Sequence, residues 1–341
     1  MLNNKQKLDF NLKSIHSFGV VDCFSRPPKN ITSINLLQDL ICSGLDNPLV
    51  IGEGSNLVFL GNYSGDIIVN NIKGIKVSET ADSYILDVAG GESWSELVVF
   101  CLKNNIFGLE NMAMIPGTVG AAPVQNIGAY GVDFSDFCVS VSCVNLISGE
   151  LLTLSKGDCN FSYRDSIFKK ELTNRVFIYK VRLSIPKAWK PNLNYAGLSD
   201  FFQKTPTAID IFNRVCSVRK QKLPDINVIG NSGSFFKNPV VSEDFLEKIK
   251  LNFPCIPYFR YQNNYKLYSG WLIDNSGLRI KSIGNVSIYD NHSLVIVNKG
   301  GAVSSDLFKL INIIKHNVQS TFNINMKLEV RLYADKGEFH I

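Results

Sequence analysis

The order of apolar and polar residues along the chain separates helix-like from strand-like segments. Residues 34–41 have the spacing of an amphipathic helix that begins after Thr32-Ser33 and ends before Gly44. Leu49-Val50-Ile51 follows as a short buried strand, and the apolar run resumes at residues 57–60. These segments predict a small unit of mixed helix and strand at the start of the chain.

The pattern of residues 66–185 is mostly that of β-strands, whose runs are rich in β-branched and aromatic residues. The runs that predict strands are residues 67–69, 84–88, 139–146 and 177–185. One helix interrupts them, because Ser93-Trp-Ser-Glu96 has the form of a capping box and an apolar run over residues 97–102 follows it. Strands with a single helix are typical of an α+β layer and not of a doubly wound parallel sheet.

Residues 205–222 predict the most amphipathic helix of the chain. Thr205 is expected to cap it and Pro206 to occupy its first position. Its apolar face would consist of Ile209, Phe212, Val215 and Val218. The helix ends in Arg219-Lys-Gln-Lys222, which either complements the helix dipole or forms an anion-binding corner.

The C-terminal part predicts shorter elements. Ser242 is expected to cap one helix and Ser304-Ser305 to open another, with a short apolar element at residues 269–273 and a strand at 294–297. The tail 326–333 alternates as a late strand with Lys327, Glu329 and Arg331 on one side. Glu329 is then either part of a solvated face or, if that face lines a cleft, a poised carboxylate.

Length and composition exclude several classes of protein. The 341 residues suit about two or three domains, and 45% hydrophobic with 19% charged residues is ordinary for a soluble globular chain. A net charge of +5 without a basic block favours an anionic ligand weakly and does not support a dedicated nucleic-acid binder. The first 14 residues lack the apolar core of a signal peptide, and no window is apolar enough for a membrane helix, so we expect a cytoplasmic protein.

The eight cysteines argue against metal and disulfide chemistry. They lie in apolar segments without a C-x-x-C pair, so we expect free buried thiols and no bound metal. Their positions are 23, 42, 101, 138, 143, 159, 216 and 255.

Two glycine-rich segments are the strongest candidates for ligand binding. Ile115 to Gly131 (IPGTVGAAPVQNIGAYG) has little apolar bulk and almost no charge, so it suits close approach of a cofactor to the backbone better than a solvated loop. Gly52-Glu-Gly-Ser-Asn56 follows a strand and offers N–H groups and a hydroxyl to a diphosphate. A plain tight turn explains the second segment equally well when it is taken alone.

Three further residues each allow a functional and a structural interpretation. Arg164, between aromatic neighbours, is either a salt-bridged residue or a fixed cation for a carboxylate or phosphate. Tyr195 is an exposed aromatic in a loop and has no special claim by itself. Ser234 lacks a neighbouring His or Asp that would make it a nucleophile, so it is a structural turn residue or a donor of a proton or hydrogen bond.

These motifs together resemble a known family. In order, IGEGSN, GLENMAMIPGTVGAAPVQNIGAYG, YRDSIFK, KLPD, GNSGSFFKNP and LEVR closely resemble the UDP-N-acetylenolpyruvoylglucosamine reductases of bacterial cell-wall synthesis. The Tyr195 loop and the long segment after Ser242 resemble the type I branch. The resemblance implies an α+β fold: an FAD-binding domain of the vanillyl-alcohol-oxidase (PCMH) type in two subdomains, followed by a C-terminal α/β substrate-binding domain.

The resemblance also implies domain boundaries and a reaction. The first FAD-binding subdomain would span residues 1–70, the second 71–218 and the substrate-binding domain 219–326, with residues 327–341 returning to the first. NADPH would reduce FAD, leave, and be replaced in the same site by UDP-N-acetylglucosamine enolpyruvate. Hydride transfer to the β-carbon and protonation would give UDP-N-acetylmuramate, a peptidoglycan precursor.

The implied site residues fall into three groups. Ser234 matches the proton donor, and Arg164 and Glu329 match the other two catalytic positions. Tyr195, Lys222 and Asn238 match positions that bind the substrate. The implied cofactor-binding residues are Gly52, Gly54, Ser55, Asn56, Ile115, Pro116, Gly117, Gly120, Ala121, Ala122, Gln125, Asn126, Gly128, Ala129, Tyr130 and Arg219.

The sequence departs from the family pattern at three places. His16-Ser-Phe-Gly19 replaces an N-T-F-G-like sequence, Gly120-Ala-Ala-Pro is less polar than usual, and the final motif lacks a proline before the glutamate.

A different oxidoreductase of the same flavin fold is one of two rival classes. It would need another C-terminal half and would usually show a histidine or cysteine for covalent flavin. Neither glycine-rich loop contains one, so we expect non-covalent FAD.

The second rival is a catalytically inactive nucleotide-binding protein. Such a protein should have lost one of the three catalytic groups, and all three are present. We expect a monomer, since no exposed heptad or long apolar edge is evident.

Overall fold

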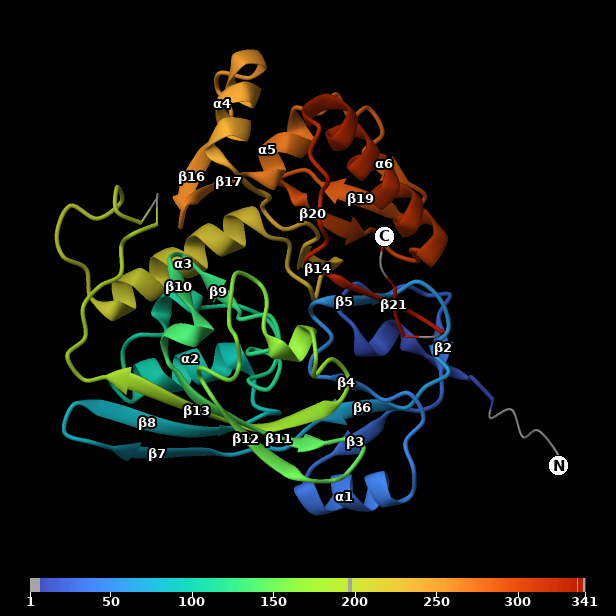
Figure 1. The fold of residues 1–341 in the computed structure, drawn as a ribbon, viewed down its shortest axis with the longest axis vertical. Coiled ribbons are helices and arrows are strands. Elements are labelled where there is room, and N and C mark those ends of the chain that lie inside the picture. The colour runs from blue at the N-terminus through green and yellow to red at the C-terminus, as the bar shows by residue number, and fades with distance from the viewer. Residues whose placement is uncertain (1–6, 196–197, 336, 340) are drawn as a thin grey trace. The chain divides into compact units, whose positions relative to one another are not determined.

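The computed structural model describes residues 7–195, 198–335, 337–339 and 341. The chain forms two compact units (Figure 1). The first contains residues 26–53 and 64–220, with residue 7 at its start, and the second contains residues 8–25, 54–63 and 221–341. The chain therefore passes from one unit to the other inside the G-E-G-S-N segment, between Glu53 and Gly54.

A parallel sheet of three strands begins the first unit. Its strand order is β3 (Lys29–Ile31), β6 (Ile67–Asn70), β4 (Leu49–Ile51). Helix α1 (Ile34–Cys42) begins as predicted, because the side chain of Ser33 accepts a hydrogen bond from the N–H of Leu36 at 3.2 Å. Leu37 of α1 is buried in an apolar cluster with Ile31 and Ile68.

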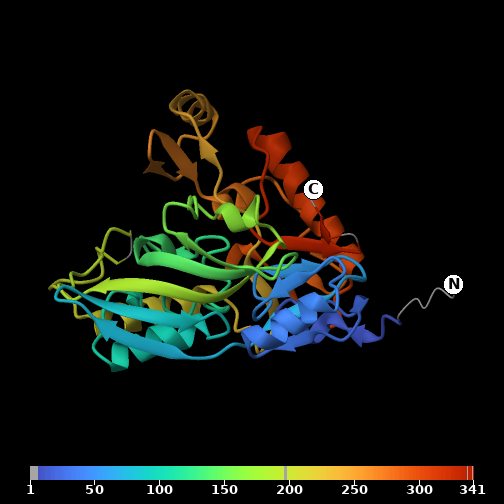
Figure 2. The same ribbon diagram turned by 60° about the horizontal axis from the view of Figure 1, so that its bottom comes forward.

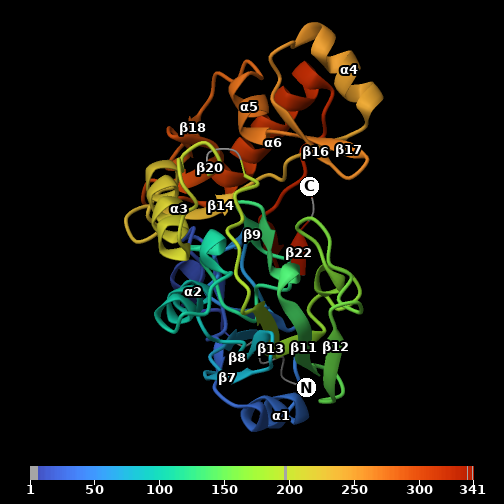
Figure 3. The ribbon, with the colours of Figure 1, turned by 90° about the vertical axis from the view of Figure 1, so that its left-hand side faces the viewer.

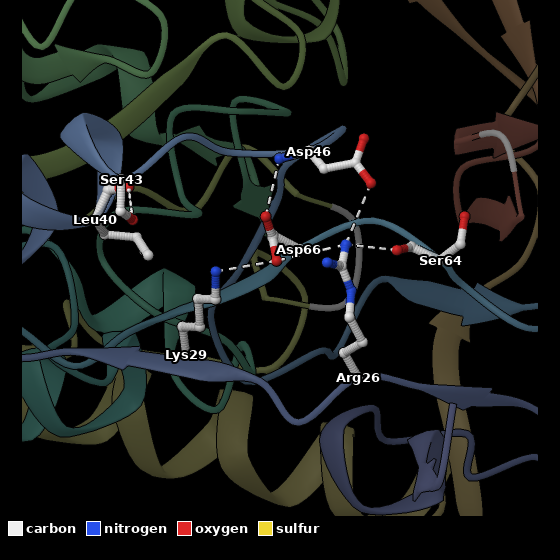
Figure 4. A network of polar contacts seen from close by, with 7 residues as sticks. All are labelled: Arg26, Lys29, Leu40, Ser43, Asp46, Ser64 and Asp66. Carbon is white, nitrogen blue, oxygen red and sulfur yellow. Dashed lines mark hydrogen bonds and ion pairs between the residues drawn. The ribbon is translucent and has the colours of Figure 1, made fainter. Parts of the chain in front are cut away.

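Five polar residues connect the ends of this small sheet (Figure 4). The buried carboxylate of Asp66 lies 3.0 Å from Lys29 Nζ and 3.5 Å from the guanidinium of Arg26. It also accepts the N–H of Asp46 at 2.9 Å. Arg26 in turn donates to the carbonyl oxygen of Ser64 at 2.6 Å. Because the carboxylate is buried, these contacts compensate for its lost hydration.

The larger sheet of the first unit is antiparallel, as Figure 2 shows for the strands coloured cyan to yellow-green. Its strand order is β12 (Leu151–Ser155), β11 (Cys138–Asn145), β13 (Val176–Pro186), β8 (Ser83–Ala89), β7 (Ile75–Glu79). Val181 in β13 lies opposite Val141 on one side and Val88 on the other. This antiparallel sheet confirms the prediction of an α+β layer.

Helices α2 (Trp94–Lys103) and α3 (Ala208–Lys222) contribute to the core of this unit (Figure 1). Two predictions about their starts were wrong. Ser93 precedes α2 without a side-chain capping bond. Helix α3 begins two residues after Pro206, where Thr207 and Asp210 exchange hydrogen bonds that stabilise the first turn. The short strands β9 (Gly128–Ala129) and β10 (Val132–Asp133) pair beside them.

The second unit has a four-stranded antiparallel sheet with helices beside it (Figure 3). The order is β14 (Gly230–Ser234), β20 (His292–Asn298), β19 (Val286–Tyr289), β18 (Ser282–Ile283). Helix α5 (Ser269–Asp274) and helix α6 (Ser304–Phe322) pack near these strands, and α6 buries Leu307, Ile311 and Ile314.

Three smaller strand groups complete the second unit. Helix α4 (Glu243–Asn252), capped by Ser242 as predicted, accompanies the sheet β15 (Val240–Val241), β17 (Asn264–Leu267), β16 (Tyr258–Tyr261). Strands β1 (Phe10–Asn11) and β2 (Phe24–Ser25) form a pair. The third sheet has the order β22 (Gly337–Phe339), β21 (Arg331–Ala334), β5 (Leu57–Phe59).

The predicted late strand is shorter than its alternation suggests. Only β21 is regular, and it pairs in parallel with β5, with Leu332 opposite Val58. Glu329 lies before this strand. The face that Glu329 was predicted to share with Arg331 is therefore not part of a regular strand. Arg331 Nε donates instead to the carboxylate of Glu338 at 3.0 Å.

The cysteines and the helices bear on two further predictions. All eight cysteines are free. Cys42 and Cys255 are exposed and Cys216 is half-buried, so the prediction of buried thiols was wrong for the first two and only partly right for Cys216. Among the described residues, no helix is both long enough and apolar enough to span a membrane.

Candidate active site

The predicted site residues are divided between the two units. The first unit holds Gly52, the predicted residues of the 115–130 loop, Arg164, Tyr195 and Arg219. The second holds Gly54, Ser55, Asn56, Lys222, Ser234, Asn238 and Glu329. Residues 196–197, the end of the predicted Tyr195 loop, lie outside the described residues.

The first half of the G-E-G-S-N segment packs on the glycine-rich loop. The carboxylate of Glu53 accepts the N–H of Gly117 at 2.8 Å. A Cβ atom at Gly52 would overlap the hydroxyl oxygen of Thr118. Both glycine-rich segments thus meet within the first unit, although they are far apart in sequence.

Glycine at position 120 is required by the protein's own backbone. A Cβ atom there would lie 2.8 Å from the carbonyl oxygen of Ile178 and 2.9 Å from that of Gly90. The N–H of Gly120 donates to that same Gly90 oxygen at 2.8 Å. Close packing of the loop on the sheet explains this residue, whereas the sequence alone suggested contact with a cofactor.

Arg164 lies against the glycine-rich loop. Its Nη2 donates to the carbonyl oxygen of Gly128 at 2.6 Å and its Nη1 to that of Asn126 at 3.4 Å. Asp133 Oδ1 lies 3.6 Å from Nη1. The side chain is only 18% exposed, so the guanidinium is held in a defined position. The two sequence-based alternatives are therefore compatible, since the ion pair helps to fix the cation.

Arg219 is a half-buried residue beside the same loop, and its guanidinium Nε is buried. Its Nη2 donates to the carbonyl oxygen of Met114 at 3.2 Å, while its buried Nε has no hydrogen-bond partner. Among the described residues, no carboxylate lies within 4.0 Å of this guanidinium. Burial lowers the pKa of Arg219, and the nearby Tyr130 opposes that shift. A partly buried cation without an anionic neighbour suits an anionic or electron-rich group such as a flavin with its diphosphate.

Two tyrosines meet at the end of the loop. The ring of Tyr195 lies edge-on to that of Tyr130, with 5.1 Å between the centroids. Burial raises the pKa of Tyr130, and the charge of Arg219 lowers it in part. Tyr130 has a φ of +50°, a left-handed conformation that turns the chain into Gly131. The substrate-binding tyrosine predicted from the family pattern therefore contacts the predicted cofactor loop.

In the second unit, backbone bonds connect the segments that carry Ser234 and Glu329. The N–H of Glu329 donates to the carbonyl oxygen of Phe235 at 2.9 Å, and the N–H of Lys237 donates to that of Lys327 at 2.9 Å. Leu328 and Phe236 form a bridge between these bonds. The predicted proton donor and the predicted glutamate therefore lie on paired segments.

Asn56 brings the second half of the G-E-G-S-N segment to the same place. Its Nδ2 donates to the carbonyl oxygen of Glu329 at 3.3 Å. Its own carbonyl oxygen accepts the N–H of Arg331 at 3.1 Å. The predicted diphosphate segment, the proton-donor strand and the glutamate are thus held together by hydrogen bonds within one unit.

Asn238 and Lys222 have different surroundings. Asn238 is positioned, because its Oδ1 accepts the N–H of Ser269 at 3.0 Å. Lys222 is exposed at the end of α3. The sequence analysis did not single out His292, whose pKa is lowered by burial and by the charge of Lys222. It named His16 and Ser17 only as part of the departure from the N-T-F-G-like pattern.

Residues 45–155 match the family described as FAD binding domain, and residues 224–333 match the C-terminal domain of UDP-N-acetylenolpyruvoylglucosamine reductase. Together with the fold, these matches define a flavin-dependent oxidoreductase. The reductase of Shewanella baltica is 43% identical over 97% of this chain and 98% of its own. That of Salmonella typhimurium is 43% identical over 96% and 97%, respectively. The chain belongs to the UDP-N-acetylenolpyruvoylglucosamine reductase family.

A solved structure supports the fold. The UDP-N-acetylenolpyruvylglucosamine reductase of Thermus caldophilus is similar with a TM-score of 0.62 at 20% identity, over 96% of this chain and 98% of that one. The family, the α+β fold class with its FAD-binding domain, and the identity of the cofactor as FAD are thereby confirmed.

Proposed function

We propose that the protein reduces UDP-N-acetylglucosamine enolpyruvate to UDP-N-acetylmuramate for peptidoglycan synthesis, with NADPH as the reductant. The 43% identity to the Shewanella baltica reductase over almost the whole chain supports this substrate. The observation that carries the proposal is the pairing of the Ser234 segment with the Glu329 segment, to which Asn56 is bonded. A reductase of an enolpyruvyl group needs a proton donor and a charged group at fixed positions.

When bound, FAD supplies hydride transfer from NADPH to the β-carbon of the enolpyruvyl group. Negative charge then develops toward the substrate carboxylate, and Arg164 is the cation that stabilises it. Ser234 Oγ gives its proton to the α-carbon, so that one hydride and one proton saturate the double bond. Glu329 orients the developing enolate, and Lys222 and Asn238 assist the serine, which is a poor acid in water.

The remaining residues bind the ligands. Arg219 and the predicted glycine-rich residues hold FAD without a covalent bond, since neither loop has a histidine or cysteine. Lys222 and Asn238 bind the sugar nucleotide, which Tyr195 covers, and NADPH uses the same site in turn. The unpartnered Nε of Arg219 supports its role toward FAD. We further propose a cytoplasmic monomer.

We retain the three-part domain division as part of this proposal. The subdomains are residues 1–70 and 71–218, the substrate-binding domain is 219–326, and residues 327–341 return to the first subdomain. Pairing of β21 with β5 supports the return of the C-terminal segment.

Anaerobic flavin spectroscopy tests the reaction. The purified protein is reduced with NADPH in the absence of oxygen, and UDP-N-acetylglucosamine enolpyruvate is then added. Rapid return of the oxidised flavin absorbance band is expected. A flavin that stays reduced would contradict the substrate, and reduction by NADH at the same rate as by NADPH would contradict the choice of reductant.

A further inference from the structure

The segment Ile15–Gly19 lies between two parts of the predicted site in the second unit. It is the segment at which the sequence departs from the N-T-F-G-like pattern. It contacts the second half of the G-E-G-S-N segment and also the strand that ends in Ser234.

The first set of contacts fixes Gly54. The N–H of Ser17 donates to the carbonyl oxygen of Gly54 at 3.1 Å, and the Ser17 hydroxyl lies 3.5 Å from the same oxygen. Gly54 has a φ of +63°, and a Cβ atom there would overlap the carbonyl oxygen of Ile15. Only glycine therefore allows this close approach, and the path of the chain into Ser55 and Asn56 depends on it.

The second set fixes the beginning of β14. The Ser17 hydroxyl donates to the carbonyl oxygen of Asn231 at 2.6 Å, and the N–H of Asn231 donates to the carbonyl oxygen of Ser17 at 3.1 Å. A Cβ atom at Gly230 would lie 2.5 Å from the carbonyl oxygen of Phe18. Strand β14 thus begins in direct contact with this segment, four residues before Ser234.

Neighbouring groups hold the segment itself in place. The side chain of Asn298 donates to the carbonyl oxygens of Phe18 and Gly19 at 2.9 and 2.8 Å. His16 is buried, and its Nδ1 accepts the N–H of Gly19 at 3.4 Å. The ring of His16 packs edge-on against Phe59. A segment held on several sides can transmit position, because its backbone has little freedom to adjust.

We infer that Ser17 is a positioning residue whose hydroxyl couples the predicted diphosphate segment at Gly54 to the proton-donor strand at Asn231. The hydroxyl of Ser17 lies within reach of the carbonyl oxygens of Gly54 and Asn231, one from each segment. The N–H of Ser17 donates to Gly54, and its carbonyl oxygen accepts the N–H of Asn231. The inference rests on the proposed function for the role of Ser234, but the coupling to the FAD segment does not depend on the identity of the substrate.

Ser17→Ala, Ser17→Thr and Ser14→Ala test this inference in the full-length holoenzyme. Ser14 is an exposed neighbour whose hydroxyl contacts only the nearby Asn11 carbonyl, at 3.4 Å, so Ser14→Ala is the matched control. The dissociation constant of FAD is measured by the fluorescence of released flavin, and flavin reoxidation by the enolpyruvyl substrate is measured by stopped flow. The melting temperature reports stability separately.

Ser17→Ala should raise the FAD dissociation constant and slow reoxidation, each by roughly tenfold, as expected for the loss of one partly buried hydrogen bond. Ser17→Thr, which keeps the hydroxyl, should restore both values to within about threefold. A lower melting temperature with unchanged FAD affinity and unchanged reoxidation would mean that Ser17 is merely structural and would overturn the inference. A change in only one of the two readouts would also overturn it, since coupling requires both.

Failure of the proposed function gives a different pattern. If the wild-type flavin is not reoxidised by the enolpyruvyl substrate, the substrate assignment fails whatever Ser17 does. The FAD dissociation constants, together with amide hydrogen exchange at Asn231, then decide the coupling. In Ser17→Ala, faster amide hydrogen exchange at Asn231 together with weaker FAD binding supports the coupling. A wild-type exchange rate at Asn231 or a wild-type FAD dissociation constant overturns it.

Discussion

The backbone N–H of Glu329 donates to the carbonyl oxygen of Phe235, the residue after Ser234, at 2.9 Å. This bond fixes the distance between two segments that are remote in sequence, and the bridge between Leu328 and Phe236 extends it. The paired backbone segments limit the relative movement of Ser234, the proposed proton donor, and Glu329. Such preorganisation reduces the entropic cost of reaching the transition state.

Ser234→Ala separates the two half-reactions. Flavin reduction by NADPH should stay nearly unchanged, while reoxidation by the enolpyruvyl substrate should slow by about 10²–10⁴-fold, as is usual for loss of a general acid. Stopped-flow absorbance of the flavin measures both rates. Ser242→Ala, which removes the cap of α4, controls for loss of a hydroxyl elsewhere in the same unit. Equal slowing of both half-reactions would show that Ser234 is structural.

Arg219→Gln should weaken FAD binding without destabilising the apoprotein. Loss of a partly buried charge without a carboxylate partner should leave the melting temperature of the apoprotein unchanged or raise it. The FAD dissociation constant should rise by at least about tenfold, because a charge-assisted contact to the cofactor is lost. Calorimetry of both forms measures the two effects, with the exposed Lys103→Gln of α2 as control. Unchanged FAD affinity would exclude Arg219 from the cofactor site.

Asp66→Asn tests the polar network of Figure 4. The side chain keeps its shape but loses its charge, so Arg26 and Lys29 lose their shared anionic partner. The free energy of unfolding should fall by about 1–3 kcal/mol, because both cations retain some solvent contact. Urea denaturation measures this loss, and Asp39→Asn on the exposed face of α1 is the control. Equal effects of the two substitutions would mean that the network adds nothing to stability.

His16→Asn should change the dependence of stability on pH. Burial lowers the pKa of His16 from 6.5 to about 4, against the opposing effect of the Leu57 carbonyl. The unfolded chain therefore takes up a proton near pH 6.5 that the folded chain resists until about pH 4. Above pH 6.5, the contribution of neutral His16 to the free energy of unfolding is complete. It is lost as the pH falls toward 4, and the loss is on the order of 3 kcal/mol.

Urea denaturation at pH 4.5, 5.5 and 7.5 measures this slope. In His16→Asn the difference in free energy of unfolding between the highest and lowest pH should be smaller than in the wild type by roughly 2 kcal/mol. His316→Asn on the exposed face of α6 is the control for the loss of an imidazole elsewhere in the chain. A wild-type slope in His16→Asn would show that another group titrates in this range.

The sequence by itself determined the elements whose signals are local. The helical spacing of α1, the Ser242 cap of α4 and the three central strands of the antiparallel sheet (β8, β11 and β13) were predicted correctly, because periodicity and capping involve residues only a few positions apart. The outer strands β7 and β12 of that sheet were not predicted. The order of short motifs identified the family, since those residues appear in the sequence whatever their partners in space. The roles of Ser234, Arg164 and Glu329 remain predictions from that pattern.

Only the tertiary structure decided which distant segments meet. The pattern around Glu329 alternates like a strand, yet regular pairing begins at Arg331, because β5 is the partner that satisfies its backbone. Ser93 lacks its predicted capping bond, and Gly120 is glycine because the backbone of Ile178 lies against it. Asn56 and Glu329 are bonded across 273 residues, and Ser17 and Asn231 across 214. No local period encodes such pairs, because they form only when the whole chain packs.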